Sequence, residues 1–139
     1  MMNGGAGESI NIEELIENLT RTLLKFDDIV FAYLYGSFAR GEYHKFSDVD
    51  IAIYLKKTSA KIYLDILGAI KIDGLEIDLK ILNDAPPLFR YRVIKEGILL
   101  LCRDEKLHEN FVFHTLVEAL EFIEDFRKLM LSKVYQSDL

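Results

Sequence analysis

The 139-residue sequence has no tryptophan, a single cysteine and only two prolines. One cysteine cannot form an internal disulfide or a cysteine zinc site, so a disulfide scaffold is not expected. No run approaches the roughly eighteen apolar residues of a transmembrane helix. The opening MMNGGAGES lacks the basic and apolar segments of a secretory signal. We therefore expect a cytoplasmic protein that does not span a membrane.

The sequence also lacks an excess of positive charge. Lys and Arg total 17 against 23 Asp and Glu, which gives a formal net charge of −6. Binding of duplex nucleic acid usually needs a basic face, and no run of Lys and Arg supplies one. Binding to long nucleic acid is therefore not expected. Any phosphate chemistry would depend on metal ions to neutralise charge.

What the chain does contain is a succession of helix and strand patterns. Hydrophobic residues make up 50% of the chain, enough for a single domain with a core. Periodicity predicts strands at 29–35, 48–55, 75–82 and 98–102. It predicts the longer helices at 12–26, 58–71, 88–96 and 104–131. We expect an α/β (α+β) fold, with a single mixed sheet of about four strands flanked by helices. Residues 1–10 are expected to be a flexible tail and 11–139 one domain.

Two aspartates open the second predicted strand, in the segment SDVDIAIYL. Residues i and i+2 of a strand share a face, so Asp48 and Asp50 would lie side by side. Two close carboxylates repel, and a cation such as Mg²⁺ or Mn²⁺ between them relieves the repulsion. The alternative is a solvated strand start. Asp78, in the next strand EIDLKIL, joins the pair if the two strands are neighbours; otherwise its face is simply exposed.

Gly36-Ser37 lies where the first buried strand ends. Glycine lets the backbone approach a ligand closely, and the next helical turn offers free N–H groups to an anion. Arg40 is three residues further on and can reach a phosphate oxygen if this turn is helical. A Gly-Ser pair alone is common in turns, so the signal depends on the aspartates that follow.

In this order the signals resemble the nucleotidyltransferase superfamily of the DNA polymerase β type, whose pattern is GS…DxD…D. The string YGSFARGEYHKFSDVDIAIYL looks closest to the minimal nucleotidyltransferases. The later RYRVIKEGILLLCRDE and the long closing helix resemble the MntA-type members, antitoxin partners of HEPN-domain toxins. The resemblance covers about residues 12–133 and implies a nucleotidyltransferase fold.

The resemblance implies transfer of AMP from ATP to a hydroxyl, which in MntA-like members is a tyrosine of the HEPN toxin. It implies that Asp48, Asp50 and Asp78 are catalytic and hold two Mg²⁺ ions, or Mn²⁺. It also implies that Gly36 and Ser37 hold the β- and γ-phosphates; Arg40 as a further phosphate contact is a hypothesis. Transfer to a small-molecule hydroxyl and toxin neutralisation by binding alone stay open as alternatives. A homodimer or hetero-oligomer also stays open.

Two further features allow alternative interpretations. Arg90 and Arg92 are expected on a solvated helix face, with nucleotide contact as the alternative. The closing helix has more apolar side chains than one stripe needs. We expect deep packing to account for them, with contact to a partner as the alternative.

Overall fold

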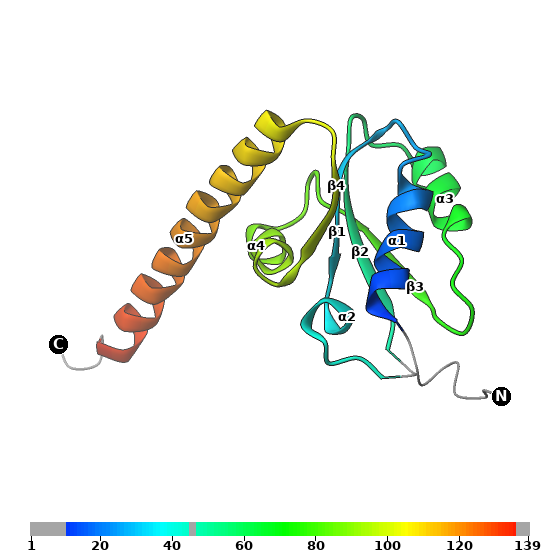
Figure 1. Cartoon of the computed structure of the whole chain (residues 1–139). Coiled ribbons are helices and arrows are strands. Elements are labelled where there is room, and N and C mark those ends of the chain that lie inside the picture. The colour runs from blue at the N-terminus through cyan, green and yellow to red at the C-terminus, as the bar shows by residue number, and fades with distance from the viewer. Residues whose placement is uncertain (1–10, 45–46, 136–139) are drawn as a thin grey trace.

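The fold is that of a computed structural model, which describes residues 11–44 and 47–135. The expected tail at 1–10 lies outside this part of the chain. Figure 1 shows the helices and strands in chain order: α1 (Ile12–Leu23), β1 (Ile29–Tyr35), α2 (Ser37–Arg40), β2 (Val49–Leu55), α3 (Ala60–Ala69), β3 (Ile77–Ile81), α4 (Pro87–Glu96), β4 (Ile98–Cys102) and α5 (Glu105–Tyr135).

The strands of the described residues form one mixed sheet in the order β3-β2-β1-β4. β1 pairs antiparallel with both β2 and β4, whereas β2 and β3 run parallel. Every residue of β1 is buried, because the strand is central and helices cover both faces of the sheet. The predicted mixed sheet flanked by helices is confirmed, with β4 at an edge.

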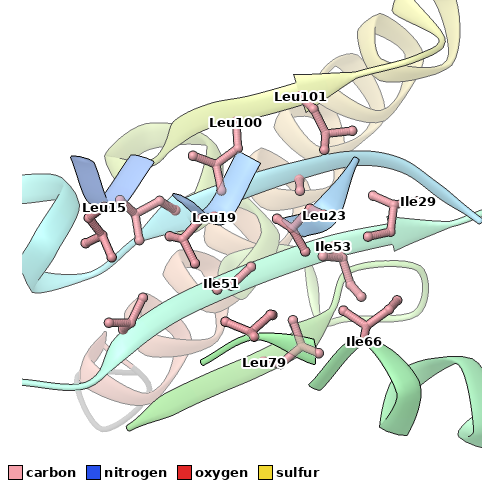
Figure 2. Packing of buried hydrophobic residues seen from close by; sticks show 14 of the residues in the cluster. Leu15, Leu19, Leu23, Ile29, Ile51, Ile53, Ile66, Leu79, Leu100 and Leu101 are labelled. Atoms are coloured by element: carbon pink, nitrogen blue, oxygen red, sulfur yellow. The ribbon is translucent and has the colours of Figure 1, made fainter. Parts of the chain in front are cut away.

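α1 and α3 cover one face of the sheet (Figure 1). The apolar residues of α1 recur every four positions, so Leu15, Leu19 and Leu23 lie on one side of the helix and are buried. Figure 2 shows them packed against the sheet, where Ile51 of β2 and Ile66 of α3 join the same cluster. This layer holds β2 in place from the face opposite to the one on which Asp50 lies.

α4 and the first half of α5 cover the other face. Val93 and Phe111 are buried there against Phe31 of β1. The ring of Phe31 lies 5.1 Å from that of Phe111 and 4.9 Å from that of Tyr54, between centroids. Alternate residues of a strand share a face, so Asp50 lies on the same side of β2 as Tyr54.

α4 begins at Pro87 and ends before Gly97. The φ of Gly97 is −80°, which any residue can adopt, so backbone conformation does not explain the glycine. Glycine is required here for space instead. An added Cβ would lie 2.3 Å from the carbonyl oxygen of Val93 and 2.8 Å from Cδ1 of Tyr33.

α5 extends well beyond the sheet, and its second half leads away from α4 (Figure 1). The expected deep packing holds only for its first turns, where Phe111, Thr115 and Ala119 are buried. Eleven large apolar side chains of α5 are exposed: Phe113, Leu116, Val117, Leu120, Phe122, Ile123, Phe126, Leu129, Met130, Leu131 and Val134. Even so, no helix within the described ranges has the length and apolar character needed to cross a membrane.

Candidate active site

Asp50 and Asp78 are brought together by the parallel pairing of β2 with β3. The two residues are direct partners in the register of the strands, so their side chains leave the same face of the sheet. Burial raises the pKa of Asp50, and the charge of Asp78 and a side-chain hydrogen bond to Asp78 raise it further. Two carboxylates therefore lie side by side in a partly buried place. Ionisation of both at once is unfavourable there.

Asp48 lies at the edge of this pair. It precedes the first residue of β2 and is exposed, although its charge still contributes to the raised pKa of Asp50. Within residues 11–44 and 47–135, no three His, Cys, Asp or Glu side chains are arranged to hold a metal ion. The site is thus a close carboxylate pair with a third carboxylate near its entrance.

Gly36 lies directly against Asp50. Its φ is +76°, a conformation that side chains disfavour. An added Cβ would lie 2.2 Å from Oδ2 of Asp50. Glycine at this position lets the turn between β1 and α2 pass over the carboxylate, with Ser37 as the next residue. Phe38 anchors the turn, because its ring is buried and stacks on Tyr43 at 4.6 Å between centroids.

Tyr35 is the last residue of β1 and pairs with Asp50 across the sheet. Burial raises the pKa of its hydroxyl, and the nearby charges of Asp50 and Asp78 raise it further. The guanidinium of Arg92 lies 5.7 Å from the centre of the Tyr35 ring. Its positive charge lowers the pKa of both Tyr35 and Asp50, against the larger effects that raise them. Arg92 is therefore a positive charge beside the aspartates.

The two arginines of α4 thus differ in their surroundings. Arg90 donates hydrogen bonds to the carbonyl of Ala85, to Thr115 Oγ1 and to Glu118, so it ties α4 to α5. Arg92 lies at the edge of the candidate site and pairs with Glu96 at 3.2 Å. The expectation of a solvated face is wrong for Arg90, whose side chain is only 12% exposed, whereas the Arg92 side chain is 50% exposed.

Glu96 links the two arginines nearest the site. Its Oε1 accepts hydrogen bonds from Arg92 Nε and from Arg40 Nη1, the latter at 3.1 Å. Arg40 also pairs with Glu42 at 2.8 Å. Contact between Arg40 and a phosphate stays a prediction, since that contact would compete with two carboxylates. Sequence reasoning missed Glu96, because nothing local shows that the end of α4 lies beside α2.

Lys80 adds a further positive charge at the pair. Its Nζ donates to Oδ1 of Asp78 at 2.9 Å, and both side chains are substantially exposed. Tyr63 of α3 supports β3 from the opposite face by donating its hydroxyl hydrogen to the carbonyl oxygen of Leu79. The site therefore combines a carboxylate pair, a glycine turn in contact with one of the carboxylates, and flanking basic side chains. This arrangement suits a metal-bound polyphosphate.

Comparison with known protein families gives a match over residues 17–106 to the family described as polymerase beta, nucleotidyltransferase. The chain belongs to this family. The matched segment is well over half of the chain and includes the turn at Gly36 together with Asp48, Asp50 and Asp78. The resemblance seen in the sequence is therefore confirmed at the level of the family.

This nucleotidyltransferase is 36% identical over 78 residues to MJ1547 of Methanocaldococcus jannaschii, a candidate protein adenylyltransferase. The match spans 56% of the chain and 60% of that relative. The relative thus supports the family assignment over a little more than half of its own length.

Solved structures share the fold. A chain of a mutant of the toxin–antitoxin MntA–HepT superposes with a TM-score of 0.66 at 19% identity, covering 90% of this chain and 98% of that one. A chain of a toxin–antitoxin with AMP-PNP gives 0.63 at 22% identity, covering 90% and 98%. A chain from the complex of a tri-AMPylated Shewanella oneidensis HEPN toxin with its MNT antitoxin gives 0.57 at 19% identity, covering 88% and 94%. These likenesses confirm the nucleotidyltransferase fold.

Proposed function

We propose that this chain is a Mg²⁺-dependent antitoxin that transfers AMP from ATP to a tyrosine hydroxyl of a HEPN-type toxin. Membership of the nucleotidyltransferase family supports transfer of a nucleotidyl group. Similarity to a candidate protein adenylyltransferase supports a protein acceptor. The fold shared with an MNT antitoxin in complex with an AMPylated HEPN toxin supports the choice of partner.

The observation that carries the proposal is the pairing of Asp50 with Asp78 beneath Gly36. A structural role alone does not account for two adjacent carboxylates whose charges disfavour each other. Nor does it account for a turn glycine in a disfavoured conformation pressed against one of them. A function that uses both carboxylates and needs close backbone approach accounts for both features.

In the proposed reaction, the acceptor oxygen forms a bond to the α-phosphorus of ATP. The bond from that phosphorus to the bridging oxygen breaks, and pyrophosphate leaves. Asp78 would accept the hydroxyl proton on Oδ2, while Lys80 holds its Oδ1 in place. Gly36 and Ser37 would hold the β- and γ-phosphates. A tyrosine hydroxyl, with a pKa near 10, is easier to deprotonate than a serine hydroxyl.

Asp48, Asp50 and Asp78 would hold the metal. Their carboxylate oxygens are the hard ligands that Mg²⁺ and Mn²⁺ prefer. Burial and the neighbouring carboxylates raise the pKa of Asp50 despite the opposing charge of Arg92, which fits a cation there. When bound, the ions would neutralise phosphate charge and stabilise the charge that develops on the attacking and leaving oxygens.

The proposal is tested by incubating the purified chain with Mg²⁺, ATP labelled at the α-phosphate, and the product of the adjacent reading frame as the candidate partner. Label on the partner supports the proposal, and tryptic mass spectrometry identifies the modified residue. Tight binding without label would instead indicate neutralisation by contact alone. Label appearing on a small hydroxyl compound but never on the partner would indicate the small-molecule alternative.

Replacing Gly36 with alanine tests the close approach at the site. The new Cβ would meet Asp50 Oδ2 at 2.2 Å in a backbone conformation that alanine disfavours. We expect the rate of AMP transfer to fall about 100-fold or more, because a displacement of the order of 1 Å at a reacting centre has that effect.

Gly68→Ala is the matched control for this change. Gly68 lies within α3, and a Cβ there would meet nothing within 4 Å. We expect Gly68→Ala to retain full activity and to unfold at equal or higher denaturant concentration, since alanine favours the helix. Equal transfer rates for the Gly36 and Gly68 variants would show that the turn does not carry the substrate.

A further inference from the structure

We propose that α5 pairs antiparallel with α5 of a second copy of this chain. The second half of the helix is apolar on most of its circumference and lies clear of the sheet (Figure 1). Leu120 is 67% exposed and Phe126 is 56% exposed. Exposed apolar clusters of this kind mark interaction surfaces in soluble proteins. Pairing of α5 does not depend on the proposed transfer activity.

The exposed side chains form a seam with the spacing of a coiled coil. Steps of three and four residues alternate along it, as at the a and d positions of a heptad. The seam consists of Phe113, Leu116, Leu120, Ile123, Arg127, Met130 and Val134. It lies about a quarter of a turn from the face with which Phe111, Thr115 and Ala119 pack against the rest of the protein. The seam is thus available while the chain keeps its own fold.

The size of the surface matches what a stable dimer needs. Eleven apolar side chains of α5 are 37% to 67% exposed. Nine of them belong to the seam or flank it at the e and g positions, whereas Phe122 and Leu129 lie on another side of the helix. At roughly 80 Å² each, the nine offer on the order of 700 Å², close to the roughly 800 Å² that one partner contributes to an interface of standard size. A narrower apolar stripe would not reach this area.

The distribution of charge along α5 selects the antiparallel orientation. Residues 118–125 carry four acidic side chains and no basic one, whereas residues 127–133 carry three basic side chains and no acidic one. Parallel pairing would place the acidic segments of the two copies side by side, and likewise the two basic segments. Antiparallel pairing sets each acidic block beside the basic block of the other copy, which adds attraction instead of repulsion.

The seam and the two charge blocks together fix the register of this antiparallel pair. In antiparallel coiled coils an a position faces a d position. Leu120 then faces Met130 of the second copy, and Leu116 faces Val134. In the same register Ile123 faces Arg127, so Glu124 of one copy lies beside Arg127 of the other. Within one chain Arg127 of the seam already pairs with Glu124, at 3.3 Å, so Glu124 lies beside the seam.

A charge-swap experiment tests this register in the full-length chain. Glu124→Arg leaves two positive charges at this point of the helix, and Arg127→Glu leaves two negative ones. Neither variant can form the pair within its own helix, and each is expected to dimerise at least about 10-fold more weakly than the wild type. An equimolar mixture of the two variants should recover dimers that contain one chain of each, as measured by analytical ultracentrifugation and native mass spectrometry.

Two further variants complete the test. Leu120→Lys should shift the protein to a monomer, with unchanged circular dichroism because the side chain is exposed. Asp65→Lys on α3 removes the distant exposed pair with Lys61 and should leave the dimer intact. A wild-type chain that stays monomeric at about 100 μM, a concentration at which micromolar dimers form, would overturn the proposal. So would dimers that Leu120→Lys does not weaken, or a mixture of charge variants that forms no mixed dimer.

Discussion

Asp50→Asn is expected to lower the rate of AMP transfer by more than about 1,000-fold, comparable to the loss of a main charge-stabilising group in other enzymes. The substitution keeps the size of the side chain and removes its charge. Asp78→Asn should have a similar effect, because Asp78 is the direct register partner of Asp50 in the parallel pair β2 and β3. Initial rates of label transfer from ATP to the partner protein measure both losses.

Asp50→Asn should fold at least as well as the wild type. Burial and the charge of Asp78 raise the pKa of Asp50, so its ionised form is less favourable in the folded chain than in the unfolded chain at neutral pH. Asparagine removes this unfavourable charge. Asp65→Asn on α3, whose ion pair with Lys61 is exposed, is the matched control and should keep full activity. Full activity in either site variant would remove that aspartate from the reaction.

Arg103→Met is expected to lower the free energy of unfolding by about 3 kcal/mol, because three charge-assisted hydrogen bonds are lost. Arg103 follows β4, and its guanidinium donates to the carbonyl oxygens of Leu24, Phe26 and Ile29 at 2.6 to 2.8 Å. These carbonyls belong to the end of α1 and the connection into β1. Without the guanidinium, all three carbonyls lose a charged donor, although that of Phe26 still accepts a hydrogen bond from the backbone N–H of Ile29.

Urea unfolding followed by circular dichroism measures this loss. Arg21→Met is the matched control, since Arg21 is exposed on α1 and a surface change of this kind stays within about 0.5 kcal/mol. Arg103→Lys should recover only part of the stability, because an ammonium group lacks the fork of donors that reaches several carbonyls. If Arg103→Met and Arg21→Met had equal effects, the guanidinium would not be what holds this junction.

The same junction shows where prediction from the sequence ended. Hydrophobic periodicity predicts a helix over 12–26, but α1 ends at Leu23. The last predicted turn is lost where Arg103, 77 residues away from Phe26, takes the carbonyl groups. Such a contact has no local signature. The start of α1 is local, since Asn11 accepts hydrogen bonds from the backbone of Glu13 and Glu14, and it was predicted correctly.

The candidate site was predictable in its residue types and less so in its geometry. Alternation along residues 75–82 correctly places Asp78 opposite the buried Leu79. The parallel pairing that makes Asp78 the neighbour of Asp50 depends on the whole sheet and could only be stated as a condition. Strand periodicity also predicted Asp48 inside the strand, whereas β2 begins one residue later and leaves Asp48 exposed.

α5 shows the same limit on a larger scale. Its periodicity predicts a long helix, and one is present to Tyr135. The part of its apolar surface that is buried depends on how far α4 and the sheet extend along the helix. The local sequence does not encode that extent. Deep packing is therefore the wrong expectation for Leu120 and Phe126, and the seam that contains Leu120 and that Phe126 flanks is a candidate interface.

A crystal structure of the chain with Mn²⁺ and a non-hydrolysable ATP analogue tests the central claim most directly. Anomalous scattering locates manganese independently of the fitted coordinates. We expect a manganese peak about 2.2 Å from carboxylate oxygens of Asp50 and Asp78, with the β- and γ-phosphates beside Gly36 and Ser37. Nucleotide and manganese bound elsewhere on the protein, with Asp50 and Asp78 contacting neither, would contradict the assignment of this site.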